Sequence, residues 1–450
     1  MSAYESELLE LARSVVERAA PGEQVEAYVS RDGETSVRVY EGEIEQLISA
    51  QSEGIGVRII RDGRVGFAYA GVLDGSVIDE VLAEARDNAS FGTPDEWAGL
   101  ATPDGVTPST ITLWRDELAS FPTDKKIALA LELEKLTLGR DHRVRVEESS
   151  FSDVLGEAAV ATSTGIAVAA RESACYVVVS TLADDGDETQ TGFAYSVGRA
   201  PDELDLERAA REASERATRL LGATKPSTRR VTVVLDPFVS AQFLGIVGGT
   251  LNGEAVLKGR SLFANRLGDE VAATHLTLVD DATNPLAFTA SEVDGEGLAT
   301  RRNVLIENGV LRRFVQSSYS GRRSGGASTG NAVRGGFKGT PGCGCLALSL
   351  APGTRTQAEL IAGVDDGVLI QMVSGLHSGV NPVSGDFSTG ASGLLIRNGE
   401  LAGPVKEFTI ASTLQRMLTD VVEVGADIEW LPMRAAGMSL VVDGLTMSGA

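Results

Sequence analysis

The chain has 450 residues, of which 43% are hydrophobic and 23% charged, and its formal net charge at pH 7 is −23. This length predicts two or three domains with a core large enough to need no disulfide or metal staple. The negative charge repels the phosphates of nucleic acids and anionic lipids, and no stretch approaches the roughly 18 consecutive apolar residues of a membrane span. Composition therefore argues against nucleic-acid and membrane partners.

Two further features predict a cytoplasmic protein. The first twenty residues show an acidic amphipathic pattern and lack the basic start and apolar run of a secretory signal. The three cysteines, Cys175, Cys343 and Cys345, are an odd number that suits a reducing compartment better than a disulfide framework.

The first half of the chain is predicted to combine an antiparallel sheet with helices. Residues 25–71 alternate in hydrophobicity, and their turns are expected at Asp32-Gly33, Glu41-Gly42, Glu53-Gly54 and Asp62-Gly63. Helical spacing follows over residues 76–91 and 123–139. Residues 143–198 return to a β pattern with a hairpin turn at 163–165, and a charged helix is expected over 202–221.

The second half is predicted to be rich in strands. Lys225-Pro226-Ser227 has the composition of a linker, so we place a domain boundary there, between residues 1–224 and 225–450. A buried strand over 231–237 leads into a helix that begins at Pro237 and ends near Gly253, and another helix is expected over 409–421. Because strands and helices do not alternate regularly, the predicted fold class is α+β, with an N-terminal mixed antiparallel sheet with helices and a C-terminal β-rich domain.

Residues that typically carry chemistry are scarce. His142, His275 and His377 are the only histidines, and none belongs to a metal-binding spacing such as HExxH. Cys343 and Cys345 form a CxC pair, which without a second cysteine or histidine pair is more typical of two ordinary thiols than of a metal site. The glycine-rich runs match neither a P-loop nor a dinucleotide-binding fingerprint.

The segment from Gly375 to Gly399, GLHSGVNPVSGDFSTGASGLLIRNG, combines six glycines with small polar side chains. Such a composition lets a backbone approach a ligand or partner closely. The segment resembles the TldD/PmbA family, specifically its TldE (PmbA) branch. Further blocks carry the same resemblance along most of the chain: EGIGVRIIRDGRVGFAYAG at 53–71, LVDDATNP at 278–285, DGEGLATRRNVLIENGVLRRFVQSSYSGRR at 294–323, STGNAVRGG at 328–336, PVKEFTIAST at 404–413 and VGAD at 424–427.

The resemblance implies a cytosolic bacterial protein that works with a TldD-type partner. In that family the TldD subunit resembles a zinc metallopeptidase with an HExxxH motif and a C-terminal cysteine ligand, and unfolded peptides are thought to reach the metal inside a heterodimer. The implied roles are peptide maturation and the degradation of small proteins. The sequence leaves open whether such a chain also pairs with itself when the partner is absent, since the two subunits of the family resemble each other.

This chain departs from the catalytic pattern at each metal ligand. The positions of HExxxH read Gly253, Glu254, Ala255, Val256, Leu257 and Lys258. Both ligand histidines are therefore replaced, and the end of the chain contains no cysteine. We predict that this chain binds no metal, that zinc belongs to the partner, and that Glu254 forms an ordinary ion pair with Lys258 one helical turn away.

We therefore predict a non-catalytic, TldE-like subunit that stabilises a zinc peptidase and shapes its substrate channel. Candidate residues for contact with a peptide or the partner are His377, Ser378, Asn381 and Asp386, with Asn331 and Arg334 as weaker candidates. Their alternative role is to hold the glycine-rich loops in shape. We also expect that the 375–399 segment offers a free strand edge to an extended peptide.

Three alternatives remain at this point. The first is a stand-alone hydrolase that uses His377 with Asp386, or a metal held by Cys343, Cys345 and a histidine. The second is a regulator of a toxin–antitoxin or DNA gyrase pathway, although the net charge argues against direct contact with DNA. The third is an enzyme of natural-product biosynthesis.

Overall fold

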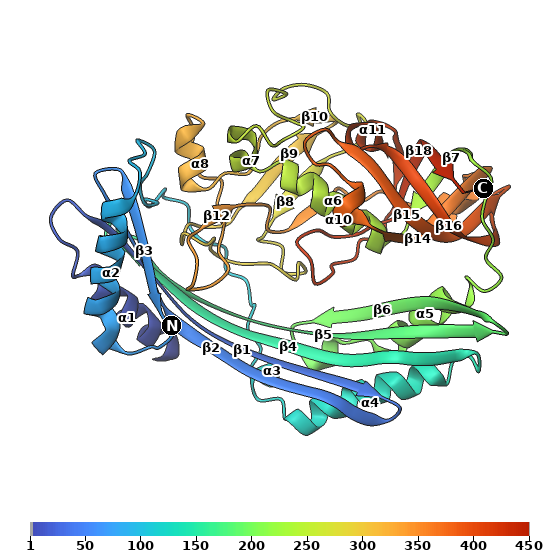
Figure 1. Ribbon diagram of the computed structural model, residues 1–450, viewed down its shortest axis with the longest axis horizontal. Coiled ribbons are helices and arrows are strands. Elements are labelled where there is room, and N and C mark those ends of the chain that lie inside the picture. Colours follow the sequence, from blue (N-terminus) through green and yellow to red (C-terminus); the bar gives the residue numbers. More distant parts are fainter. Residues whose placement is uncertain (1–2, 450) are drawn as a thin grey trace.

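The computed structural model describes residues 3–449 and has the predicted α+β architecture (Figure 1). A long, curved six-stranded antiparallel sheet dominates the N-terminal part, in the order β3-β2-β1-β4-β5-β6. Its strands are β1 (Gln24–Tyr40), β2 (Glu43–Arg61), β3 (Arg64–Ala70), β4 (Val144–Thr162), β5 (Ala167–Asp185) and β6 (Glu188–Gly198).

Helices cover one face of this sheet. They are α1 (Ala3–Val16), α2 (Ile78–Phe91), α3 (Asp116–Ala119), α4 (Thr123–Leu138) and α5 (Leu206–Thr218). Odd-numbered residues of β1 face them: Val25 and Val29 pack with α1 and α2, whereas Val37 and Val39 pack with α4 and α5. Because neighbouring side chains of a strand point to opposite faces, the even-numbered residues of β1 face the C-terminal part.

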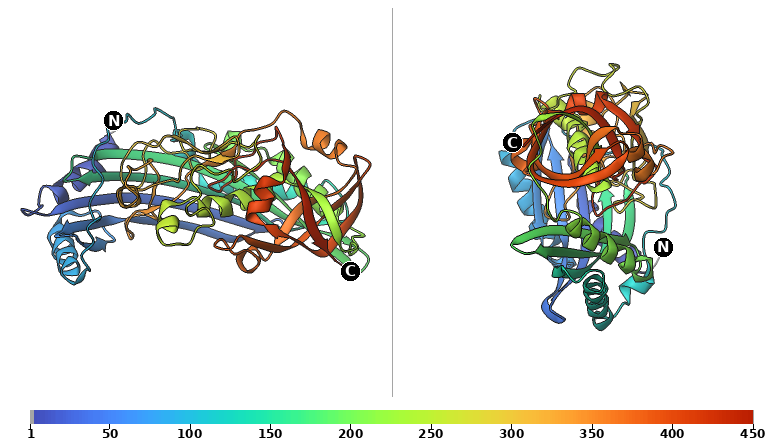
Figure 2. Two further views of the ribbon diagram at one scale, coloured as in Figure 1. Left: turned by 90° about the horizontal axis from the view of Figure 1, so that it is seen from above. Right: turned by 90° about the vertical axis from the view of Figure 1, so that its right-hand side faces the viewer.

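The C-terminal part contains a second six-stranded sheet, in the order β16-β15-β14-β7-β18-β17, in which β16 also pairs with β18. This additional pairing curls the sheet into a barrel-like ring (Figure 2). Its strands are β7 (Arg229–Leu235), β14 (Asp366–Ser374), β15 (Asp386–Arg397), β16 (Glu400–Thr413), β17 (Val421–Val424) and β18 (Leu440–Ser448). Helix α6 (Pro237–Thr250) packs in its core, where Phe243 and Leu244 are buried.

Smaller elements complete the C-terminal part. The helices are α7 (Gly253–Leu257), α8 (Ser318–Arg323), α9 (Gln357–Ala362), α10 (Leu376–Gly379) and α11 (Leu414–Thr419). The strands are β8 (Leu278–Asp281), β9 (Arg302–Glu307), β10 (Val310–Leu311), β11 (Ala332–Val333), β12 (Gly342–Cys343) and β13 (Leu348–Leu350). Among the helices of residues 3–449, none has the length and apolar character needed to cross a membrane.

Two of the four predicted turns in residues 25–71 are wrong. Glu41-Gly42 and Asp62-Gly63 do form turns, and both residues of each pair have positive φ angles, as tight hairpins require. Asp32-Gly33 and Glu53-Gly54 instead lie inside β1 and β2, where they pair with neighbouring strands. At position 54 glycine serves a different purpose, because an added Cβ would lie 2.4 Å from the Phe337 ring. A C-terminal loop therefore rests directly on β2.

The helix expected over 409–421 is also shorter than predicted. Residues 409–413 belong to β16, because Thr409, Ile410 and Ala411 pair with both β15 and β18. The helix begins only at Leu414, where the Thr413 side chain caps it by accepting from the Arg416 amide. The predicted domain boundary near residue 225 lies between α5 and β7.

Candidate functional site

Helix α7 and the residue after it carry the two altered positions of the HExxxH motif, Gly253 and Lys258, and the retained Glu254. Asn252 caps the helix, because its side chain accepts hydrogen bonds from the amides of Glu254 and Ala255. The Lys258 Nζ lies 2.9 Å from Glu254 Oε2, which is the ion pair predicted from the sequence. The one carboxylate retained from the motif is therefore neutralised by the residue that replaces a histidine.

The first motif position has no room for a side chain. A Cβ added at Gly253 would lie 2.0 Å from Gln316 Oε1, so the Gln316 side chain fills the space that a ligand at position 253 would need. Gln316 Oε1 is itself buried and accepts no hydrogen bond in the described structure. Position 253 thus offers neither a metal ligand nor space for one while Gln316 keeps this conformation.

Cys343 and Cys345, which lie near α7, do not replace the missing metal ligands. Cys343 lies beside α7, where its thiol donates to the Val315 carbonyl at 3.1 Å, and burial raises its pKa to about 11. Burial likewise raises the pKa of Cys345 well above its usual value. Within residues 3–449, no three His, Cys, Asp or Glu side chains are grouped so that they could hold a metal ion. The residues present therefore do not fit the zinc site that the family motif implies.

The candidates of the 375–399 segment are exposed and lie between β14 and β15: His377 and Ser378 in the short helix α10, Asn381 in the loop after it and Asp386 at the first residue of β15. Ser378 donates to the Gly375 carbonyl at 3.2 Å, Asn381 accepts from the amides of Val383 and Ser384, and Asp386 accepts from the Ser384 hydroxyl at 2.6 Å. In the described part of the chain, His377 makes no hydrogen bond or ion pair with Asp386. These contacts hold the loop in shape, and contact with a peptide or partner stays a prediction for these residues.

The expectation of a free strand edge in this segment is wrong. Residues 386–397 form β15, which pairs with β14 on one side and with β16 on the other. Its backbone donors and acceptors are consequently used within the barrel-like sheet, and an extended peptide has no open edge to join there.

Asn331 and Arg334 connect loops in the interior. Asn331 is fully buried and donates to the Asp280 carboxylate at 2.6 Å. Arg334 lies over the Tyr28 ring, with its guanidinium carbon 4.6 Å from the ring centroid, and it pairs with Glu26 of β1. Burial opposes ionisation of Glu26, but Arg334 and Arg58 outweigh that effect and lower its pKa. These contacts tie the C-terminal loops to the N-terminal sheet, and any grip on a peptide carboxylate stays a prediction.

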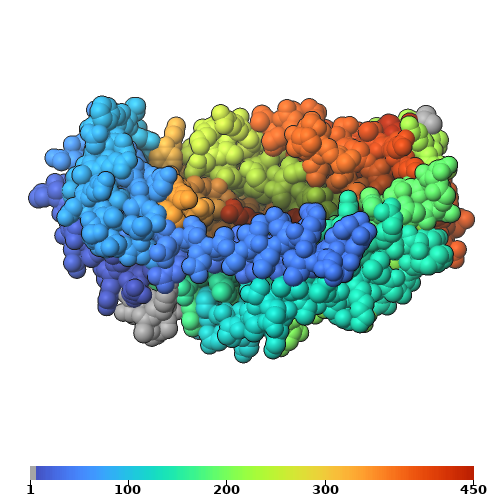
Figure 3. Space-filling model, turned by 60° about the horizontal axis from the view of Figure 1, so that its bottom comes forward, coloured from blue at the N-terminus to red at the C-terminus, as the bar shows by residue number. Residues whose placement is uncertain are grey.

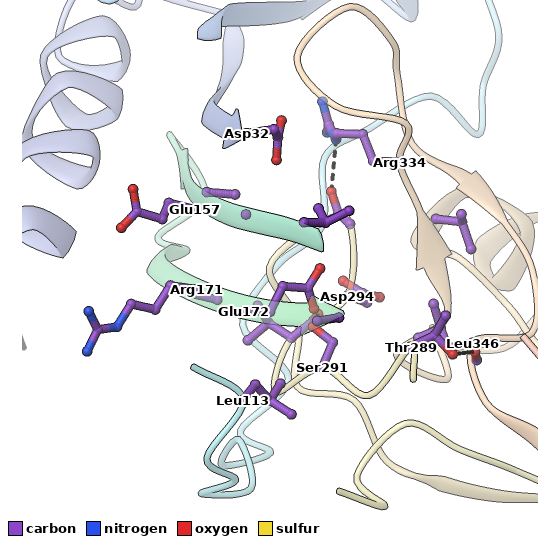
Figure 4. Close-up of a pocket in the computed structure, with 18 of the residues that line it drawn as sticks. Asp32, Leu113, Glu157, Arg171, Glu172, Thr289, Ser291, Asp294, Arg334 and Leu346 are labelled. Atoms are coloured by element: carbon purple, nitrogen blue, oxygen red, sulfur yellow. Dashed lines mark hydrogen bonds between the residues drawn. The ribbon is translucent and has the colours of Figure 1, made fainter. Parts of the chain in front are cut away.

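A cavity of about 340 Å³ lies between the N-terminal sheet and the loops of the C-terminal part. The space-filling view shows a hollow between the edge of the sheet, in blue, and the C-terminal part, in yellow-green to red (Figure 3). The sheet contributes Asp32, Gly156 and Glu172 to the wall, and the opposite wall includes Ser291, Asp294 and Arg334 (Figure 4).

The cavity concentrates acidic groups whose pKa values are raised. For Asp32, which is half-buried, and Glu172, which is exposed toward the cavity, the main cause is the loss of hydration beside the surrounding protein. Burial, together with the nearby Glu296, also raises the pKa of Asp294 to about 7. Sequence reasoning singled out none of these three residues, because Asp32 belongs to a dipeptide typical of turns and the other two belong to no catalytic motif. Only the pairing of distant strands brings them together.

Comparisons with known proteins identify the family. Three domain models match in order: PmbA/TldA metallopeptidase domain 1 at residues 25–89, the central domain at 116–221 and the C-terminal domain at 228–449. The metalloprotease PmbA of Escherichia coli O157:H7 is 27% identical over 426 residues, which cover 94% of this chain and 92% of the relative. A PmbA homologue of Haemophilus influenzae is 28% identical, covering 100% and 98%.

Solved structures agree at the level of the fold. TldE from Thermococcus kodakarensis superposes with a TM-score of 0.90 over 99% of this chain and 100% of that one, at 24% sequence identity. With three family models matching in order along the sequence and relatives matching over nearly its whole length, the chain belongs to the PmbA/TldD metallopeptidase family.

Proposed function

We propose that this chain is the non-catalytic, TldE-like subunit of a heterodimeric metallopeptidase that cleaves unfolded peptides in the cytoplasm. In this assembly a TldD-like partner holds the zinc ion and cleaves the peptide, while this chain stabilises the partner and shapes the substrate channel. The proposal covers both peptide maturation and protein turnover.

One observation carries the proposal. At the position of the catalytic helix, α7 has a glycine packed against Gln316 and a lysine paired with Glu254 in place of two histidine ligands. A zinc peptidase needs three protein ligands and an open position for water. A member of this family that lacks those ligands contributes to peptidase activity most simply as a subunit beside an intact one.

Reconstitution tests the proposal. The chain and a TldD-like protein from the same organism are purified separately, and cleavage of an unfolded peptide is measured for each protein alone and for the mixture. We expect no cleavage by this chain alone, cleavage by the mixture, and a heterodimer by light scattering. Glu254→Gln in this chain leaves the mixture active, whereas the corresponding change in the partner's intact motif abolishes cleavage.

The same experiment distinguishes the proposed subunit role from the alternative of a stand-alone hydrolase. Cleavage by this chain alone, lost in His377→Ala, contradicts the proposal and supports catalysis by the exposed loop. A mixture in which the two proteins neither associate nor cleave the peptide also contradicts it.

A further inference from the structure

Two carboxylates converge over a glycine on the sheet wall of the cavity. Asp32 of β1 and Glu172 of β5 both lie directly opposite Gly156 of β4. Residues directly opposite one another in neighbouring strands project from the same face of a sheet. A Cβ added at Gly156 would lie 3.4 Å from Asp32 Oδ1 and 3.9 Å from Glu172 Oε1. Both carboxylates therefore flank the same space, which is open only because residue 156 has no side chain.

Neither carboxylate has a cationic partner within the described part of the chain. Asp32 accepts only a long hydrogen bond of 3.5 Å from Ser30, and Glu172 accepts none. Arg199 lowers the pKa of Glu172 from a distance, but its guanidinium donates to the carbonyls of Ser173, Ala287 and Phe288. Arg434 also lines the cavity and makes no ion pair within 4 Å in residues 3–449.

The other two acidic side chains of the cavity, Asp294 and Glu157, are either hydrogen-bonded or directed elsewhere. Asp294 accepts hydrogen bonds from the backbone amides of Glu296, Leu298 and Ala332. Glu157 neighbours Gly156 in β4 and therefore points to the opposite face of the sheet, away from Asp32 and Glu172 (Figure 4). Among the described residues that line the cavity, Asp32 and Glu172 are therefore the carboxylates that face it with neither a cationic partner nor backbone amides bound to them.

Asp32 is half-buried and Glu172 is exposed toward the cavity, and the loss of hydration beside the surrounding protein raises the pKa of both carboxyl groups. A cation placed between the two carboxylates, above Gly156, would stabilise their charged forms and lower both pKa values. Apolar side chains of the cavity, which suit the stem of a long basic side chain, are Tyr28, Leu113, Val154, Val160, Val168 and Phe288. Four arginines, Arg171, Arg199, Arg334 and Arg434, also line the cavity. Lysine and arginine characteristically lay such apolar stems along hydrophobic surfaces and keep the charged end in a polar site.

We propose that this cavity binds a cationic group of a peptide, either an ammonium or a guanidinium, between Asp32 and Glu172 above Gly156. The volume of about 340 Å³ accommodates one residue rather than a folded segment. The inference rests on the proposed function only in taking a peptide as the ligand. It assigns this chain a preference for a basic residue or a free amino terminus in the substrate.

Binding of short fluorescent peptides to the complete chain tests this inference. The first probe is an acetylated and amidated Ala-Ala-Lys-Ala-Ala, the second has glutamine in place of lysine, and the third is the glutamine peptide with a free amino terminus. We expect the lysine peptide to bind at least about tenfold more tightly than the acetylated glutamine peptide, as charged hydrogen bonds predict. Tight binding of the third peptide assigns the site to the amino terminus instead of the side chain.

Variants of matched charge complete the test. Glu172→Gln and Asp32→Asn are each expected to weaken binding of the cationic peptide about tenfold. Gly156→Val should do the same by filling the space between the carboxylates. Glu84→Gln removes the same charge from the exposed surface of α2, outside the cavity, and should leave binding unchanged. Circular dichroism confirms that each variant is folded.

Equal binding of the lysine and acetylated glutamine peptides, with no gain from a free amino terminus, overturns the inference. So does a loss in Glu84→Gln as large as that in Glu172→Gln, because attraction to the overall negative charge would then explain the preference. These outcomes are independent of the reconstitution experiment. Cationic peptides that bind while the mixture fails to cleave contradict only the proposed function, and the reverse pattern contradicts only the cavity site.

Discussion

Replacing Arg334 with methionine is expected to lower the free energy of unfolding by about 3–5 kcal/mol, which is the usual result of breaking a buried ion pair from one side. Arg334 is almost completely buried, pairs with Glu26, and donates to the carbonyls of Gly295 at 3.0 Å and Gly339 at 3.2 Å. Methionine keeps the apolar stem but leaves the Glu26 carboxylate with less compensation and two carbonyls without a donor. Urea denaturation followed by circular dichroism measures the change.

Arg301→Met is the matched control for this prediction. Arg301 also joins the two parts of the molecule, through an ion pair of 2.6 Å with Asp104, but about a quarter of each side chain is exposed. Water screens such a pair, so its loss should cost less than about 1 kcal/mol. Equal destabilisation by the two substitutions would contradict the role assigned to burial of the pair between Arg334 and Glu26.

A second large effect is expected in the pH dependence of stability. The pKa of Asp294 rises from 3.8 to about 7 on folding, chiefly because the group is buried. Between these values the folded chain binds more protons than the unfolded chain, so this group's contribution to stability is lost as the pH rises from about 4 to about 7. The full difference is on the order of 4 kcal/mol, at about 1.4 kcal/mol for each pKa unit.

Comparison with Asp294→Asn isolates this contribution. The variant cannot titrate at this position, yet its side-chain oxygen still accepts from the amides of Glu296 and Leu298. Unfolding is measured for both proteins from about pH 4 to about pH 8. The advantage of the wild-type chain should shrink across this interval and become constant above about pH 7. A difference that does not vary with pH would show that Asp294 keeps an ordinary pKa in the folded chain.

The sequence correctly predicts turns whose geometry depends only on neighbouring residues. The hairpin turns at Glu41-Gly42 and Asp62-Gly63 form because two consecutive residues adopt positive φ angles. The same Asp-Gly signal at positions 32–33 fails, because strands on both sides hold these residues in extended pairing. Glu53-Gly54 fails for a related reason, since glycine there accommodates Phe337 from a loop almost 300 residues away.

The two candidate sites also differ in how far the sequence predicts them. The altered HExxxH positions were predictable because the motif is contiguous, and the structure adds the ion pair between Glu254 and Lys258 and the placement of Gln316 against Gly253. The carboxylate pair above Gly156 was not predictable. Asp32 is far from Gly156 and Glu172 in sequence, and only the register of β1, β4 and β5 places the three residues in one row.

The zinc content of the chain, purified alone without a metal-affinity tag and measured by elemental mass spectrometry, tests the central claim most directly. Because the three HExxxH positions supply no ligand set, we predict well under about 0.1 zinc ion per chain. About one zinc ion per chain, retained after desalting, would contradict the proposal that this subunit leaves metal binding and catalysis to its partner.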